Sequence, residues 1–184
     1  MKKVLIISSV LIGAIVLLVF FLLLWHGMFT KPVISEKELG PYAFVYDEFK
    51  GDYKDTGPIF EKVYNALNKL PVNSTVGIAI YLDDPATVPA AERRSQCGSV
   101  FDLNDSIKVI ALEPQFKLGN LPRQKYIVVE FPIKSSLSYM LGPSIGYPAL
   151  TKYATEKNYA FAQPIEIYDM SANVTLYAMP VVAK

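Results

Sequence analysis

An unbroken apolar run near the N-terminus constrains this chain more than any other feature. From Val4 to Trp25 the sequence reads VLIISSVLIGAIVLLVFFLLLW, without a charged residue. At about 1.5 Å of rise per residue, a helix of this length covers roughly 30 Å, which is the thickness of a bilayer core. The run therefore predicts one transmembrane anchor over residues 4–25, in contact with the lipid bilayer.

A cleaved signal peptide is the alternative interpretation of the same run. Lys2 and Lys3 precede it, but signal peptides have an apolar region of about 7–15 residues followed by a small-residue cleavage site. Here the run is longer, and residues 25–31 (WHGMFTK) contain no such site. Trp25 and Phe29 are instead typical of aromatic residues at a membrane interface. We therefore expect an uncleaved signal-anchor.

The charges that flank the run leave the orientation open. Lys2 and Lys3 favour a cytosolic N-terminus, with the rest of the chain lumenal or extracytoplasmic. Lys31 and Lys37 supply as many side-chain charges on the other flank. Three sequons would accept glycans only if they are lumenal, and they begin at Asn73, Asn104 and Asn173.

The rest of the chain has the size of one domain. We expect a juxtamembrane linker over residues 26–39 and a single domain over residues 40–184. The net charge of +1 provides no basic field for nucleic acid, so direct nucleic-acid binding is not expected. Cys97 is the only cysteine and His26, at the membrane boundary, is the only histidine. The domain therefore lacks the residues for an intrachain disulfide, a histidine-based triad or a Cys-rich zinc site, and no cofactor is expected.

Hydrophobic periodicity predicts alternating strands and helices. Strands are expected at residues 42–49, 75–82, 93–101, 107–112, 126–131, 160–168 and 174–181. One helix is expected after Pro58, up to residue 70. A second is expected over residues 136–158, broken at Gly142-Pro143 and restarted near Pro148.

The order strand–helix–strand–strand occurs twice in this pattern. It predicts an α+β fold with a duplicated β-α-β-β unit, an antiparallel sheet and two helices on one face. The opposite, concave face is expected to carry the candidate ligand-binding residues Tyr81, Tyr126, Glu130, Glu166 and Tyr168. A solvated sheet surface is one interpretation of these residues. A small-molecule pocket with a polar anchor is the other.

The domain resembles the GyrI-like small-molecule-binding domain family. The resemblance is carried by the doubled unit and by the segments Pro164–Tyr168 and Met179-Pro180-Val181, and it narrows further at Ile78–Val100 and Leu137–Tyr168. Together with the N-terminal run, the layout is similar to membrane-anchored ER-phagy receptors of animals that carry this domain. That resemblance implies an endoplasmic reticulum protein with a cytosolic domain, a role in reticulophagy, and autophagy and AAA-ATPase partners.

Two departures from these relatives affect the expected function. The chain stops at Lys184, soon after the last expected strand, so we expect it to lack the tail that carries the autophagy docking motif. Drug-binding GyrI-like domains commonly have a glutamate where this chain has Leu176. Because a buried unpaired cation costs several kcal/mol, Glu130 or Glu166 would replace that glutamate only from within the same cavity.

Two classes of function follow from these observations. The first is a membrane-anchored binding or adaptor module without catalytic residues. The second is a small-molecule sensor or hydrolase, in which Glu130 or Glu166 acts as a base and Tyr81 or Tyr168 holds the developing charge.

Overall fold

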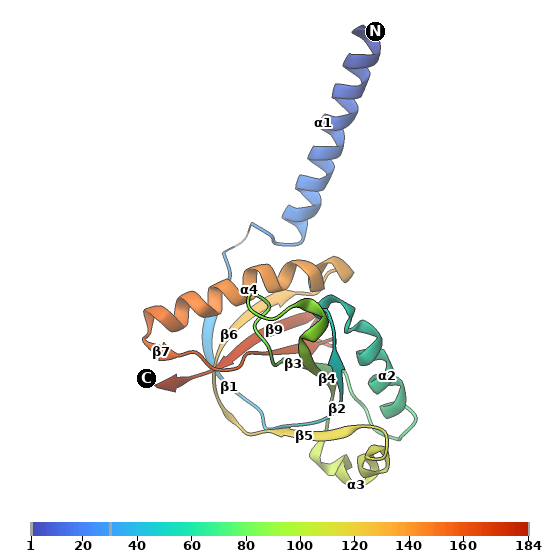
Figure 1. Ribbon diagram of the computed structural model, residues 1–184, viewed down its shortest axis with the longest axis vertical. Coiled ribbons are helices and arrows are strands. Elements are labelled where there is room, and N and C mark those ends of the chain that lie inside the picture. Colours follow the sequence, from blue (N-terminus) through green and yellow to red (C-terminus); the bar gives the residue numbers. More distant parts are fainter. Residues whose placement is uncertain (1, 30, 184) are drawn as a thin grey trace.

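The computed structural model describes residues 2–29 and 31–183, and it consists of a projecting helix and one α+β domain (Figure 1). The helices are α1 (Lys2–Trp25), α2 (Gly57–Leu67), α3 (Ser106–Val109) and α4 (Ser136–Glu156). The strands are β1 (Ile34–Leu39), β2 (Tyr42–Lys50), β3 (Val76–Tyr81), β4 (Arg94–Phe101), β5 (Lys117–Leu121), β6 (Gln124–Pro132), β7 (Tyr159–Ala160), β8 (Ile165–Asp169), β9 (Val174–Pro180) and β10 (Val182–Ala183). The expected fold class is confirmed.

Eight strands form one curled antiparallel sheet in the order β1-β6-β9-β8-β3-β4-β2-β5. Its two halves follow the predicted duplication, since one contains β2-α2-β3-β4 and the other β6-α4-β8-β9. The halves meet at the central pair of β3 and β8, where Ala79 lies opposite Glu166 and Gly77 opposite Tyr168. Residues that are far apart in sequence are thereby brought together in the middle of the sheet.

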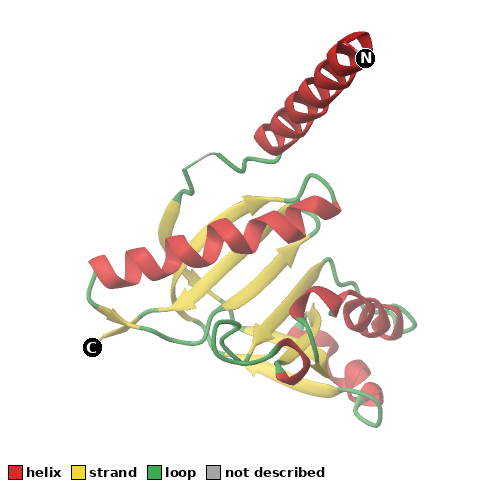
Figure 2. Cartoon of the chain, turned by 45° about the horizontal axis from the view of Figure 1, so that its top comes forward, coloured by secondary structure: helices red, strands yellow, loops and turns green. Residues whose placement is uncertain are grey.

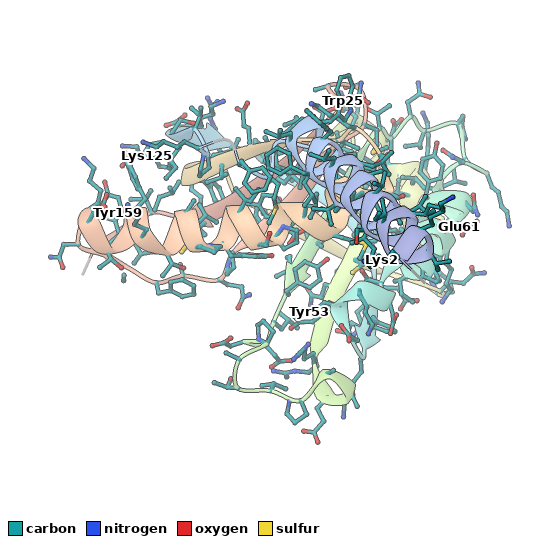
Figure 3. All side chains as sticks on the ribbon, turned by 90° about the horizontal axis from the view of Figure 1, so that it is seen from above. Lys2, Trp25, Tyr53, Glu61, Lys125 and Tyr159 are labelled. Atoms are coloured by element: carbon teal, nitrogen blue, oxygen red, sulfur yellow. The ribbon has the colours of Figure 1, made fainter. Side chains whose placement is uncertain are left out.

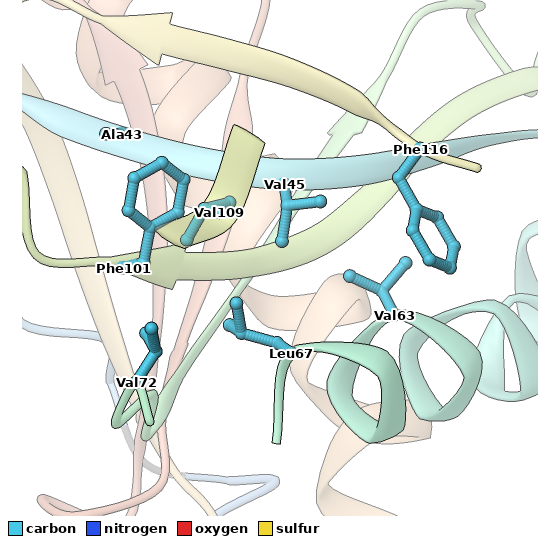
Figure 4. Packing of buried hydrophobic residues seen from close by; sticks show 8 residues of the cluster. All are labelled: Ala43, Val45, Val63, Leu67, Val72, Phe101, Val109 and Phe116. Carbon is cyan, nitrogen blue, oxygen red and sulfur yellow. The ribbon is translucent and has the colours of Figure 1, made fainter. Parts of the chain in front are cut away.

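The helices α2 and α4 cover the same face of this sheet (Figure 2). On α2, Val63 and Leu67 are buried against Val45 and Phe101 of the first half, as the predicted apolar stripe requires (Figure 4). On α4, Leu150 packs in a second cluster with Ile127, Val129 and Tyr177 of the other half. The opposite face of the sheet is occupied by a third cluster, formed by Tyr126, Val128, Ile165, Ile167 and Ala178.

The helix α4 is continuous, so the break predicted at Gly142-Pro143 and the restart near Pro148 are wrong. Proline removes a backbone donor from a helix and normally kinks or breaks it. Here Gly142 and Gly146 bring the helix against the ring of Tyr177 on β9, on both sides of Pro143. A Cβ atom on Gly146 would lie only 2.4 Å from Tyr177 Cγ, so only glycine permits this close packing.

The strand predicted at residues 107–112 is also wrong. These residues form the short helix α3 and a 3-10 turn over Ile110–Leu112, in which Val109 is buried whereas Ile107 is 85% exposed. The side chain of Asp102 accepts a hydrogen bond from the Asn104 amide at 2.8 Å and starts the turn that precedes α3. The Asp102 cap and the tertiary burial of Val109 thus outweigh the β-propensity of the segment.

Three strands lie where other structure was expected. β1 pairs with β6, so the sheet begins inside the expected linker of residues 26–39. β5 pairs with β2 over residues for which no strand was expected. The strand expected at residues 160–168 is divided, since β7 pairs with β10 in a separate small ladder and β8 lies at the centre of the main sheet.

Within the described residues, α1 is the one helix long and apolar enough to cross a membrane by its length and composition. None of its apolar window is buried against the domain. Figure 1 shows it projecting away from the sheet, with α4 lying crosswise beneath its C-terminal end.

Candidate functional site

A large cavity lies on the helix-covered face of the sheet, between α2 and α4. Its volume is about 1740 Å³, and the central strands β3 and β8 line it. Each of these elements contributes an aromatic residue to the lining, namely Phe60 of α2, Tyr81 of β3, Tyr147 of α4 and Tyr168 of β8. The concave face opposite the helices, where the candidate residues were expected, is filled by the third apolar cluster instead.

The carboxylate of Glu166 lies in this cavity and is almost completely buried. The residue is only 3% exposed. Tyr147 Oη donates a hydrogen bond to Glu166 Oε1, and Tyr168 Oη donates one to Glu166 Oε2. The Tyr81 hydroxyl lies 3.4 Å from the Tyr168 hydroxyl, so Tyr81 donates to Tyr168 and completes a short chain of hydroxyls that ends on the carboxylate.

Aromatic rings surround this polar group. The ring of Phe60 stands edge-on to Tyr168, with centroids 5.4 Å apart, and Tyr139 approaches the same ring at 5.7 Å. Tyr53 packs on Tyr81 at 4.5 Å. The hydroxyl of Tyr53 donates a hydrogen bond to the Asp83 carbonyl at 2.8 Å, which fixes this ring in place. The walls therefore present aromatic faces and edges around one carboxylate.

Burial controls the electrostatics of the site. It raises the pKa of Glu166 from 4.5 to about 7, although the hydrogen bonds from Tyr147 and Tyr168 act in the opposite direction. Burial, together with the nearby Glu166 carboxylate, also raises the pKa of Tyr81, Tyr147 and Tyr168. These hydroxyls therefore remain protonated donors near neutral pH, while Glu166 changes charge there.

No positive side chain balances Glu166 among the residues that the structure describes. The salt bridges found there all involve other carboxylates. In the same part of the chain, no group of three His, Cys, Asp or Glu residues is arranged to hold a metal ion. Within the described part of the chain, the Glu166 carboxylate therefore has its hydrogen bonds satisfied but no counter-ion.

Three of the five predicted site residues meet in the cavity, namely Tyr81, Glu166 and Tyr168. Tyr126 and Glu130 do not. On β6 the odd-numbered residues Ile127 and Val129 face α4, so the even-numbered residues point to the other side of the sheet. Tyr126 is buried there in the third cluster, and Glu130 forms an exposed ion pair with Lys37 of β1.

Glu166 lies one strand away from the position at which drug-binding relatives were expected to carry their glutamate. Leu176 belongs to β9 and packs against the third cluster on the opposite face. Its neighbour Tyr177 is the β9 residue paired with Glu166. The carboxylate in this cavity is thus supplied by β8, from within the same cavity as the aromatic lining.

Sequence reasoning missed Tyr53, Phe60, Tyr139 and Tyr147 as lining residues. The signal was present on α4, where Tyr139, Pro143 and Tyr147 recur every four residues and all line the cavity. With a helix break predicted at Pro143, Tyr139 and Tyr147 would lie on separate helices. Only in a continuous helix does the four-residue spacing place them on one face.

The chain shows moderate sequence similarity to two curated proteins. It is 29% identical over 152 residues to testis-expressed protein 264 homolog of Mus musculus, covering 78% of this chain and 48% of that protein. It is 28% identical over 170 residues to testis-expressed protein 264 of Homo sapiens, covering 86% of this chain and 53% of that protein. The chain thus spans about half the length of these curated relatives. No protein-family model matches the chain.

Comparison with solved structures establishes the fold. The crystal structure of the EcmrR C-terminal domain superposes with a TM-score of 0.56 at 15% identity, over 83% of this chain and 99% of that one. EcmrR in a cryo-EM complex with DNA superposes with a TM-score of 0.55 at 18% identity, over 99% of this chain and 70% of that one. The domain accordingly has the GyrI-like fold that the sequence resemblance implied.

Proposed function

We propose that this chain is a membrane-anchored protein whose GyrI-like domain binds a hydrophobic organic cation between α2 and α4. The observation that carries this proposal is the carboxylate of Glu166, which is buried among aromatic rings without a positive partner among the described residues. Removing a charge from water is costly, and an opposite charge in the same low-dielectric site offsets that cost.

The aromatic walls supply a second source of affinity for such a ligand. A cation over the face of a tyrosine or phenylalanine ring is attracted by the ring quadrupole, by about 0.5–2 kcal/mol per contact. Phe60, Tyr81 and Tyr168 provide rings close to Glu166. A ligand that combines a delocalised or quaternary positive charge with an apolar body therefore matches both components of the cavity.

Binding of a fluorescent cation to the purified full-length chain tests this proposal. Rhodamine 6G is a suitable probe because it is a hydrophobic cation, and rhodamine B, which carries a free carboxylate, is its matched net-neutral control. We expect rhodamine 6G to bind the wild type with higher fluorescence anisotropy than Glu166→Gln at pH 8. Dye that is taken up by detergent contributes equally to both samples, so the difference in anisotropy between the two proteins reports binding at the site. Equal binding by both proteins, or a preference for rhodamine B, would contradict the proposal.

We propose a binding role rather than hydrolysis because both oxygens of Glu166 already accept tyrosine hydrogen bonds. Each of these hydrogen bonds stabilises the ionised carboxylate and so weakens it as a base toward water. Incubation with ester probes that enter the cavity distinguishes the two roles. Product formation that is lost in Glu166→Gln would establish the enzyme instead.

We propose that α1 is an uncleaved anchor in the endoplasmic reticulum and that the domain lies in the cytosol. The length and exposure of α1 support the anchor, and the likeness to testis-expressed protein 264 motivates the compartment. Protease treatment of sealed microsomes that contain a C-terminally tagged chain tests the orientation. Loss of the tag without detergent supports a cytosolic domain, whereas protection together with glycosidase-sensitive mobility supports a lumenal one.

A second candidate role is that of an adaptor in reticulophagy, with autophagy or AAA-ATPase partners. It is supported by the likeness of this domain to testis-expressed protein 264. Residues 64–67 (YNAL) and 147–150 (YPAL) fit the aromatic-x-x-aliphatic docking pattern. Their aliphatic residues, Leu67 and Leu150, are fully buried. We therefore expect the purified chain not to bind the ubiquitin-like proteins of the autophagosome by itself. Direct binding in calorimetry would show that one of these segments opens.

A further inference from the structure

The C-terminal end of α1 is joined to the start of α4 by side-chain contacts. His26 is buried, and its Nε2 lies 2.8 Å from Ser135 Oγ while its Nδ1 lies 2.8 Å from the Leu22 carbonyl. Lys134 Nζ donates to the Trp25 carbonyl and lies 4.9 Å from the centre of the Trp25 ring. We call Trp25, His26, Lys134 and Ser135 the α1–α4 joint.

The α1–α4 joint places one end of the cavity next to the membrane-facing helix. Ser135 is the N-cap of α4, since its Oγ accepts a hydrogen bond from the Leu137 amide at 3.2 Å. Tyr139 and Met140 follow within about 8 Å along the helix axis. Figure 3, which looks at the molecule from above, shows α1 projecting over the end of α4 near Trp25.

Apolar side chains are exposed at this end of the cavity. Met140 is 76% exposed, and Tyr64, Tyr139 and Met170 are also exposed although all four line the cavity. Tyr139 Oη contacts Met170 Sδ at 3.6 Å, so the start of α4 and the turn that follows β8 are adjacent. We call Tyr64, Tyr139, Met140 and Met170 the apolar rim. Exposed apolar side chains that line one cavity indicate contact with an apolar partner.

We propose that the apolar rim lies in the interfacial region of the bilayer spanned by α1, so that the cavity takes up a cationic amphiphile laterally from the membrane. This inference rests on the anchor and the cation site proposed above. Because α4 runs crosswise to α1 (Figure 1), Tyr139 and Met140 stay near the level of the α1–α4 joint instead of receding from the membrane. Because Trp25 ends the membrane helix, the joint itself belongs to the interface.

The chemistry of the cavity agrees with such a ligand. Its apolar rim would contact the hydrocarbon part of an amphiphile, while Glu166 lies deeper, among Tyr147 and Tyr168. An amphiphile that enters from the membrane keeps its apolar part out of water throughout. Its charged head then exchanges lipid phosphates for the Glu166 carboxylate.

Quenching of tryptophan fluorescence by lipids brominated near the headgroup tests the position of the apolar rim. The full-length chain is reconstituted in phosphatidylcholine vesicles with and without bromine. The native Trp25, the only tryptophan, reports whether α1 is inserted. In a Trp25→Phe background, Met140→Trp and Met170→Trp report the rim, and Ile107→Trp on the exposed helix α3 is the matched control. Two rim positions are used so that misfolding of one variant does not decide the result.

We expect Trp25 and both rim indoles to lose about half or more of their emission in brominated vesicles, as residues of an interfacial apolar surface do. The Ile107→Trp indole is expected to keep its emission. If Trp25 is quenched while the rim indoles behave like the Ile107→Trp control, the rim proposal is overturned and the anchor stands. If Trp25 is not quenched, the anchor fails as well, whereas rhodamine binding tests the cation site separately.

Discussion

The hydroxyl of Tyr147 donates a hydrogen bond to the carboxylate of Glu166, which joins the middle of α4 to the central strand of the sheet. The two residues come from different layers of the fold and meet inside a cavity whose other walls are mostly aromatic. This contact satisfies the buried carboxylate without neutralising its charge. The ionised carboxylate therefore still destabilises the empty site, and a ligand of opposite charge would offset that destabilisation.

Binding of a hydrophobic cation is expected to strengthen as the pH rises through about 7. Burial sets the pKa of Glu166 to about 7, and only the ionised carboxylate attracts a cation. At pH 6 about a tenth of the sites are ionised and at pH 8 most are, so the affinity at pH 6 is expected to be about tenfold weaker. Titration of rhodamine 6G at pH 6, 7 and 8 measures this change. A flat profile, or one that weakens with rising pH, is incompatible with Glu166 as the anionic partner.

Glu166→Gln is expected to stabilise the unliganded domain at pH 8. The pKa of Glu166 is higher in the folded protein than its usual 4.5, so the unfolded chain loses the proton first and stability falls as the pH rises from 4.5 to about 7. The full effect is on the order of 3 kcal/mol, and the neutral amide avoids it while its oxygen accepts from one tyrosine hydroxyl and its NH2 donates to the other. Denaturant unfolding should show a gain of about 1–3 kcal/mol at pH 8 and little gain at pH 5.

The control for this experiment is Glu156→Gln, at the exposed end of the same helix that covers the site. It is expected to leave stability nearly unchanged at both pH values, because exposed charges are well screened. A loss of stability in Glu166→Gln at pH 8 would mean that the ionised carboxylate holds the cavity together.

Replacement of Tyr147 by phenylalanine is expected to move the pH profile of binding upward. The Tyr147 hydroxyl stabilises the ionised carboxylate, so its removal raises the pKa of Glu166 further above its ordinary range. Binding of rhodamine 6G at pH 7 should weaken and recover at higher pH. Tyr153→Phe is the matched control, since Tyr153 lies on the same helix but donates to Glu36 at 3.2 Å, outside the cavity. An unchanged midpoint in Tyr147→Phe would assign that hydroxyl a packing role only.

The sequence predicted the duplicated unit because its signals are local and strong. The stripe of α2 shows the helical period, and its residues Val63 and Leu67 are buried as that period requires. The face of the sheet to which each strand residue points was harder to predict. Tyr126 and Glu130 have the correct chemistry for the site, but the register of β6 against β9 sends them to the other side of the sheet. A strand's register depends on partners far away in the chain, which periodicity alone does not reveal.

Proline chemistry accounts for the principal error in the candidate site. A helix interior with Pro143 and Pro148 is unfavourable by itself, so a break was the reasonable prediction. The tertiary contact of Gly142 and Gly146 with Tyr177 outweighs this local preference and keeps α4 intact. Tyr147, which contacts Glu166, could therefore be placed only once the packing of α4 was known.

Gly146→Ala is expected to destabilise the domain by about 1–3 kcal/mol through overpacking. The added Cβ would lie 2.4 Å from Tyr177 Cγ, an atom close to the backbone of β9 that cannot rotate away, so α4 must lift from the sheet. Gly57→Ala at the start of α2 is the matched control, because its Cβ would meet nothing within 4 Å. Alanine is favoured over glycine in helices by up to about 1 kcal/mol, so the control should be neutral or slightly stabilising.

Denaturant unfolding of the full-length chain in detergent measures both variants. Because α4 carries Tyr139 and Tyr147, the lifted helix should also weaken rhodamine 6G binding. Equal stability of the two variants would show that α4 does not depend on this contact to remain continuous through Pro143.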